Sequence, residues 1–293
     1  MALPECDAPA GWTEPSVEWR LGTDCAAYYQ WLVEHAERLV TWPPAPFEDT
    51  ATDCFRVGND YCVWQPGIGG VRFSQDRPEF IAFPSSSVDP ESFKYLITRS
   101  WLPAVYQVWG RQVLHASAVA ATQSADVVAF AGPTQAGKST LAYGLAQRAG
   151  WQLVCDDTLS FSSDNSTINL HPLPNESRLR PLSAAHYGRT ESVPEPVVWP
   201  ERPLHLRAVF FLAGDSNHRL PVAITRLKAA DAYSLLLGQA FALTFKLPKH
   251  NQQLMREYLA LAASVPVYRL AYRKSFDVMD EIFDVVEESL RTA

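Results

Sequence analysis

The chain has 293 residues, of which 47% are hydrophobic and 19% are charged, a composition typical of a folded protein and not of a disordered one. Its 25 basic and 32 acidic side chains give a net charge of −7, which argues against nucleic acid as a partner. No apolar run is long enough to cross a membrane and no signal-peptide pattern opens the chain, so we expect a cytoplasmic protein without a membrane partner.

Residues 1–110 predict a small β-rich α+β domain. The apolar spacing of residues 24–39 predicts one helix, and four β-like runs separated by turn residues follow it: CFRVG, YCVWQ, GVRFS and EFIAF. Residues 90–108 predict a second helix that is interrupted at Pro103. The many aromatic side chains of this domain are candidates either for ordinary core packing or for a peptide-binding surface.

Residues 111–293 predict an α/β domain, because strand-like runs alternate with helix-like ones. The expected strands are VLHASAVAA, DVVAFAG, WQLVCDD, LRAVFFLAG and VPVYRLAY. The run KSTLAYGLAQRAG predicts a helix that ends at Gly150. The segment between residues 175 and 203 is rich in proline and polar residues, which predicts a long loop or lid.

One motif carries specific chemistry. Residues 132–140, GPTQAGKST, satisfy the P-loop pattern G-x-x-x-x-G-K-[ST] between an apolar strand and a helix. In such a loop the backbone N–H groups and the helix N-terminus bind phosphate, the lysine contacts the β- and γ-phosphates and the serine hydroxyl holds Mg²⁺. The expected nucleotide contacts are Gly132, Thr134, Gln135, Ala136, Gly137, Lys138, Ser139 and Thr140.

Two aspartates, Asp156 and Asp157, end the strand that follows the P-loop helix. Carboxylates at the carboxyl edge of such a sheet face the nucleotide, where one can bind Mg²⁺ and the other can accept the proton of an attacking hydroxyl. A purely metal-binding pair or a solvated turn is the alternative interpretation. His115, in the strand before the P-loop strand, is by itself more typical of a satisfied core histidine.

In combination, the string LHASAVAA…VVAFAGPTQAGKSTLAYGLAQRAGWQLVCDDTLSF resembles the catalytic domain of the HPr kinase/phosphorylase superfamily. That family places a histidine-containing strand, a P-loop and an Asp-Asp pair in this order. The resemblance is specific over about residues 112–161, weaker over 203–245 and not visible over 1–100. It implies a P-loop core of the HPr kinase/PEP carboxykinase type, and a kinase that uses ATP and Mg²⁺ to phosphorylate a serine hydroxyl.

The resemblance also implies roles for single residues. Asp156 becomes the general base, Asp157 a metal ligand together with Ser139, and His115 a group that orients an aspartate or the phosphoryl group. The segment after the aspartates engages substrate in this family, and here it holds Glu176, Arg178 and Arg180, of which an arginine could neutralise transition-state charge. An exposed loop is the alternative for these three residues.

The resemblance leaves the acceptor open. The longer sequence that follows the aspartates in the bifunctional HPr kinases is missing, so HPr is not the expected substrate. The length and the unrelated N-terminal domain fit the small serine kinases that tailor lasso peptides, which implies a peptide or protein acceptor and, by family habit, a possible homo-oligomer. A small-molecule kinase of the same fold and a non-catalytic nucleotide-binding regulator are the alternatives.

Overall fold

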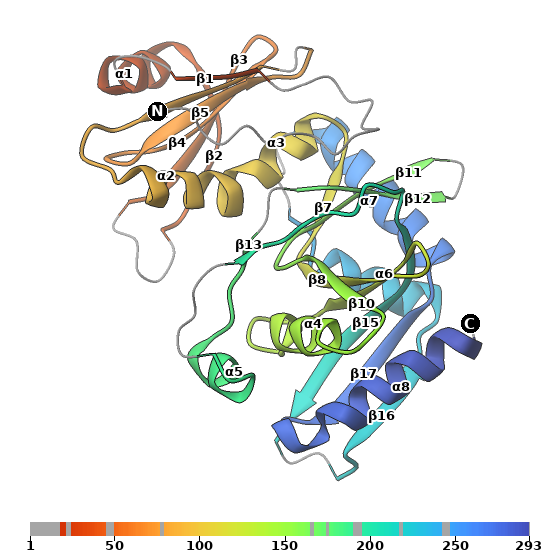
Figure 1. The fold of residues 1–293 in the computed structure, drawn as a ribbon. Coiled ribbons are helices and arrows are strands. Elements are labelled where there is room, and N and C mark those ends of the chain that lie inside the picture. Colours follow the sequence, from red (N-terminus) through yellow and green to blue (C-terminus); the bar gives the residue numbers. More distant parts are fainter. Residues whose placement is uncertain are drawn as a thin grey trace. The chain divides into compact units, whose positions relative to one another are not determined.

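The computed structural model describes the following residues: 18–21, 25–44, 50–76, 79–164, 167–173, 176–189, 195–216, 219–241 and 247–292. The chain forms two compact units, residues 1–110 with 242–251 and residues 111–241 with 252–293. The division after residue 110 lies where the sequence places its domain boundary, but the structure groups residues 242–251 with the first unit. The class is mixed α/β (Figure 1).

The first unit is built on a six-stranded sheet in the order β1-β6-β5-β4-β3-β2. Its strands are β1 (Glu18–Leu21), β2 (Glu37–Trp42), β3 (Thr52–Val57), β4 (Asp60–Gln65), β5 (Gly69–Ser74) and β6 (Glu79–Pro84). Strands β2 to β6 form an antiparallel meander, and β1 pairs with β6 in parallel. The four strand predictions for this region are confirmed, because alternating apolar runs between tight turns specify hairpins locally.

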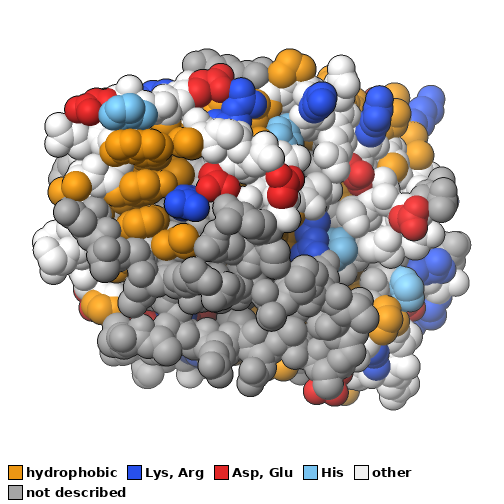
Figure 2. Space-filling view, turned by 90° about the horizontal axis from the view of Figure 1, so that it is seen from above, with side chains coloured by type: hydrophobic (Ala, Val, Ile, Leu, Met, Phe, Trp, Pro, Cys, Tyr) orange, Lys and Arg blue, Asp and Glu red, His pale blue; other side chains and the backbone are white. Residues whose placement is uncertain are grey.

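Helix α1 (Cys25–His35) packs on this sheet through Leu32, whose neighbours include Trp64 and Phe83. The predicted helix over 24–39 is too long, since β2 already begins at Glu37. The segment Leu39–Trp42 favours a strand, and its pairing with β3 overrides the helical spacing that reaches residue 39. Figure 2 shows a group of hydrophobic side chains on the face in view. The Trp31 side chain of α1 is 40% exposed.

The helix expected over 90–108 is present as α2 (Pro90–Leu96), the π-helical turn η1 (Ile97–Trp101) and α3 (Leu102–Val108). The interruption lies before Pro103 and not at it. Proline lacks an N–H group and its ring crowds the carbonyl one turn earlier, so the wider turn in η1 accommodates it without ending the helix.

The second unit is built on a mixed nine-stranded sheet, as far as the described residues show. Its strands are β7 (Gln112–Leu114), β8 (Ala116–Ala121), β9 (Asp126–Ala131), β10 (Trp151–Cys155), β11 (Leu159–Asp164), β12 (Thr167–His171), β15 (His205–Asp215), β16 (Val222–Arg226) and β17 (Val267–Arg273). The path runs β10-β8-β9-β15-β12-β11-β7, and β17 pairs with β15 and β16. Strands β11, β12 and β16 are not among the strands expected from the sequence.

Strand direction decides which ends meet. β15 pairs in parallel with both β9 and β17, while β8 is antiparallel to β9 and to β10. β10 therefore runs in the same direction as β9, β15 and β17. The carboxyl ends of these four strands lie at one edge of the sheet, which is where α/β folds bind their ligands.

The remaining elements of this unit are α4 (Lys138–Ala146), β13 (Glu176–Ser177), α5 (Pro181–His186), β14 (Glu195–Pro196), α6 (Ala229–Leu237), α7 (Pro248–Ser264), η2 (Phe276–Val278) and α8 (Met279–Thr292). The first four residues of α7 are grouped with the first unit. Helix α4 ends at Ala146, four residues before the expected end at Gly150, because the chain turns there to start β10. Within the described part of the chain, no helix is both long and apolar enough to cross a membrane.

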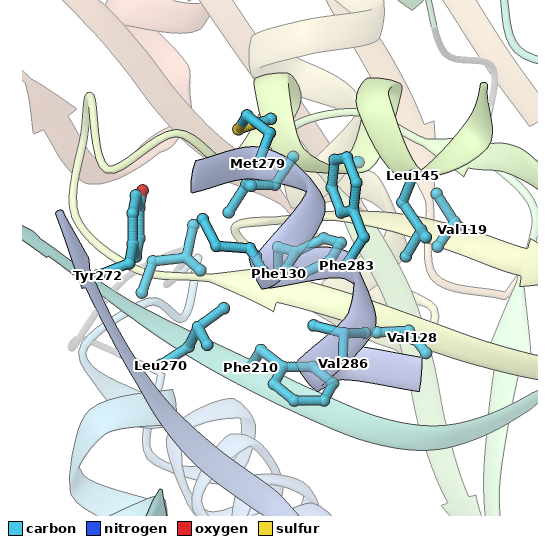
Figure 3. Close-up of a cluster of buried hydrophobic side chains, with 14 of the residues drawn as sticks. Val119, Val128, Phe130, Leu145, Phe210, Leu270, Tyr272, Met279, Phe283 and Val286 are labelled. Atoms are coloured by element: carbon cyan, nitrogen blue, oxygen red, sulfur yellow. The ribbon is translucent and has the colours of Figure 1, made fainter. Parts of the chain in front are cut away.

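The core of the second unit lies between the sheet and the helices α4 and α8. Figure 3 shows Phe283 and Val286 of α8 directed toward Phe130 and Phe210 of the two central strands, with Leu145 of α4 beside them. Phe130 and Phe210 are fully buried. Burial of such rings stabilises the fold by about 2 kcal/mol each, so the P-loop strand and its helix rest on a rigid core.

Candidate active site

The P-loop segment connects β9 to α4 in the strand–loop–helix context that the motif requires. Gly132, Gln135 and Gly137 have positive φ angles of 145°, 66° and 100°. A Cβ atom on Gly137 would lie 2.8 Å from the hydroxyl of Tyr272, and one on Gly132 would lie 3.1 Å from a backbone oxygen. Both glycines are therefore required by conformation and by space.

Phosphate-binding groups meet at the start of α4. This helix has no side-chain cap, and its N-cap is Gly137, so its first N–H groups and its dipole are directed at the loop. Lys138 is 6% exposed, and its Nζ donates to the carbonyls of Gly132 at 3.0 Å and Pro133 at 3.3 Å. Burial lowers the pKa of Lys138, while the charges of Asp157 and Asp156 raise it.

Two side chains from the end of β17 hold the loop from the other side. The hydroxyl of Tyr272 donates to the carbonyl of Ala136. Lys274 Nζ donates to the carbonyl of Gln135 at 2.8 Å. The loop is therefore fixed in shape by the neighbouring strand, while Thr134 and Gln135 stay exposed. Neither Tyr272 nor Lys274 was predicted, because their role depends on the parallel pairing of β17 with β15.

The first turn of α4 presents two hydroxyls that the sequence assigned to the nucleotide. Ser139 is half-buried at this turn. Thr140 Oγ1 lies 2.8 Å from Ser183 Oγ of α5, and the Tyr187 hydroxyl donates to the Thr140 carbonyl at 3.1 Å. Thr140 thus anchors α5 to the P-loop helix, whereas the Ser139 side chain has the position that the motif assigns to a metal ligand.

Asp156 is a buried carboxylate with 1% exposure. Its Oδ1 accepts from Ser117 Oγ at 2.8 Å and its Oδ2 accepts from the backbone N–H of Arg178 at 3.1 Å. Both oxygens are engaged inside the protein, so this side chain is poorly placed to take a proton from an incoming hydroxyl. Ser117 was not predicted, although it lies two residues after His115 and therefore on the same side of an extended chain.

Asp157 is the accessible member of the pair. Its Oδ1 lies 2.7 Å from His115 Nε2, and the two side chains are 38% and 41% exposed. Asp157 has a φ of 76°, a left-handed conformation that is uncommon for residues other than glycine, although aspartate adopts it more readily than most. Its backbone N–H donates to Ser117 Oγ at 3.4 Å. The turn therefore directs Asp157 outward while Asp156 stays inside.

His115 does not lie within a strand, so the expected continuous strand VLHASAVAA is wrong. β7 ends at Leu114 and pairs with β11, whereas β8 begins at Ala116 and pairs with β9 and β10. The chain changes partner strands at His115, whose backbone N–H donates to the Gln239 carbonyl at 2.9 Å. This break leaves the imidazole free of the sheet and next to Asp157.

The segment after the aspartates is more ordered than the loop that the sequence predicted, since it contains β13, α5 and β14. Arg178 and Arg180 are exposed, and the charge of Arg180 lowers the pKa of Lys138. Arg180 therefore lies near the phosphate loop, and Arg178 reaches the site through its backbone N–H. Glu176 is half-buried in β13.

These residues fit a magnesium nucleotide. The glycine-rich loop leads into α4, which directs uncapped N–H groups at it, and the buried Lys138 ammonium supplies positive charge. The hydroxyl of Ser139 and the carboxylate of Asp157 are oxygen donors of the kind that Mg²⁺ prefers.

No protein-family model matches the chain. Two tRNA dimethylallyltransferases of Rhodopseudomonas palustris are similar to part of it. One is 31% identical over 111 residues, which are 38% of this chain and 29% of that protein. The other is 31% identical over 109 residues, which are 37% of this chain and 31% of that protein. The chain thus spans less than a third of the length of these relatives.

Among solved structures, the Hpr(Ser) kinase/phosphatase from Coxiella burnetii is similar to this chain. The TM-score is 0.33 and the sequence identity 13%, over 61% of this chain and 90% of that one.

Proposed function

We propose that this protein is a Mg²⁺-dependent kinase that transfers the terminal phosphoryl group of ATP to an alcohol, the serine hydroxyl of a peptide or protein. The observation that carries the proposal is the pair formed by Asp157 and His115, 2.7 Å apart and accessible, whose carboxylate acts electrostatically on the P-loop lysine Lys138. Nucleotide binding alone requires no base, whereas phosphoryl transfer to a hydroxyl does.

Asp157 is the group best placed to act as the base. In the reaction, the acceptor oxygen forms a bond to the γ-phosphorus, the bond from that phosphorus to the β–γ bridging oxygen breaks, and ADP leaves. The proton of the acceptor hydroxyl passes to the Asp157 carboxylate. His115 donates from Nε2 to Oδ1 of this carboxylate and so fixes its direction. Because of their different burial, we assign the base to Asp157 and not to Asp156, to which the family resemblance gives it.

The other groups bind and orient. Lys138 and the start of α4 hold the phosphates, and the exposed Arg180 adds positive charge near them. Asp156 supports the turn through Ser117 and the Arg178 backbone. Mg²⁺ bound by the Ser139 hydroxyl would neutralise charge on the phosphates.

Phosphoryl transfer from γ-labelled ATP to serine-containing peptides tests the proposal. Asp157→Asn and Lys138→Ala are expected to lower transfer at least a hundredfold, the usual contribution of a positioned base. Asp126→Asn is the matched control, because Asp126 lies at the opposite end of β9 from the loop. Unchanged transfer in Asp157→Asn would refute the assignment of the base.

The acceptor is tested in the same assay. Label on serine peptides and none on free serine or sugars supports the peptide kinase, and the reverse result selects a small-molecule kinase. ATP binding that depends on Lys138, without transfer to any hydroxyl, would identify a non-catalytic regulator and overturn the proposal.

A further inference from the structure

The ends of the parallel strands place two different surfaces on either side of the phosphate loop. Counting across the sheet, β10 lies two strands from β9 on one side, and β17 lies two strands from β9 on the other. The aspartates follow β10, and residues 274–278 follow β17. Neighbouring strands are about 4.8 Å apart, so each surface lies roughly 10 Å from the loop.

The proposed function, on which this inference rests, gives the bound nucleotide a direction. Its terminal phosphate must face Asp157, which lies on the β10 side. The nucleoside at the other end of the triphosphate therefore extends away from Asp157, across the loop and toward the end of β17.

Two stacked rings lie at that position. His186 of α5 and Phe276 of η2 have ring centroids 4.2 Å apart and planes inclined by 12°. Both side chains are exposed, Phe276 at 37%, although its near neighbours Val278 and Met279 are buried in the core. The Phe276 ring is thus held at the surface by a partner ring instead of being buried.

Short contacts tie this ring pair to the phosphate loop from both sides. Lys274, two residues before Phe276, donates to the Gln135 carbonyl at 2.8 Å. Tyr187, the residue after His186, donates to the Thr140 carbonyl at 3.1 Å. The pair is therefore connected to the middle of the loop and to the first turn of α4.

We infer that the stacked rings of Phe276 and His186 form the binding surface for the base of the nucleotide. A purine can extend the existing stack by one more ring, because stacking needs only an accessible aromatic face. Stacking tolerates any purine, so this surface binds adenine and guanine nucleotides alike. Stacking on these rings raises the affinity for the nucleoside part of the nucleotide and leaves the phosphate contacts unchanged.

Isothermal titration calorimetry in the presence of Mg²⁺, with ATP and with inorganic tripolyphosphate, tests the inference. Phe276→Ala and His186→Ala are expected to weaken ATP binding about tenfold and to leave tripolyphosphate binding within twofold. Phe276→Trp retains the ring and should keep ATP affinity. Met255→Ala is the control for losing an exposed apolar side chain in the same unit.

The outcomes separate this inference from the proposed function. ATP affinity within twofold of wild type in both alanine variants would overturn the inference, as would an equal loss for ATP and tripolyphosphate, which would indicate a distorted loop. His186→Ala removes an exposed side chain and serves as the test if Phe276→Ala does not fold. Wild-type protein that binds neither ligand would overturn the proposed function and the inference with it.

Discussion

Replacing Ser117 by alanine tests how much its buried hydroxyl stabilises the turn at Asp156 and Asp157. Ser117 and Asp156 are 0% and 1% exposed, and the hydroxyl donates to the carboxylate at 2.8 Å. Hydrogen bonds to charged groups are worth about 1.5–3 kcal/mol. No water can replace the hydroxyl at this depth without rearrangement, so Ser117→Ala should lower the free energy of unfolding by about 2 kcal/mol.

Urea denaturation measures the free energy of unfolding of Ser117→Ala, and Ser124→Ala is the control variant. Ser124 Oγ also donates to an aspartate, Asp126, at 3.0 Å, but this bond is exposed, so its loss should change stability by less than about 0.5 kcal/mol. Because Ser117 also accepts from the Asp157 N–H, its alanine variant should lower phosphoryl transfer as well. Equal effects of the two substitutions on stability would refute the argument from burial.

Two further predictions concern the loop and the sheet. Gly137→Ala should abolish nucleotide binding in calorimetry, because its φ is 100° and its Cβ would meet the Tyr272 hydroxyl at 2.8 Å, whereas Gly150→Ala, with a φ of 94° and open space, should only lower stability. Burial and the charge of Arg111 lower the pKa of His171 from 6.5 to about 4. Between these pH values the unfolded chain binds a proton that the folded chain does not, so the free energy of unfolding decreases as the pH is lowered. His171→Gln should therefore lose about 1 kcal/mol less stability than wild type between pH 7 and pH 5, allowing for solvent screening, and an unchanged pH dependence in urea denaturation would contradict this.

The parts of the fold that could be predicted are those that neighbouring residues specify. The hairpins from β3 to β6 and the unit from β9 through α4 follow from alternation, turn residues and one motif. The prediction failed where pairing with a distant strand decides the structure. Residues 37–39 belong to the predicted helix but pair with β3, and the break at His115 exists because β7 and β8 have different partner strands.

The candidate site, like the fold, could be predicted where neighbouring residues specify it and not where distant residues do. The order of His115, the P-loop and the two aspartates is visible in the chain, and it indicates phosphate chemistry. Which aspartate is accessible is not visible, because Asp156 is buried by Ser117 and by the Arg178 backbone, 39 and 22 residues away. The supports of the loop, Tyr272 and Lys274, come from more than 130 residues further along the chain.

The left-handed backbone of Asp157 explains how two adjacent aspartates can have different roles. In an extended strand, successive side chains point to opposite faces, and both would be fixed by the sheet. A non-glycine residue in the left-handed region costs about 1–2 kcal/mol. Here Ser117 accepts the Asp157 N–H and His115 binds its carboxylate, so both contacts favour this conformation. Ser117 also donates to Asp156, and one serine therefore keeps the first carboxylate buried while it stabilises the turn that exposes the second.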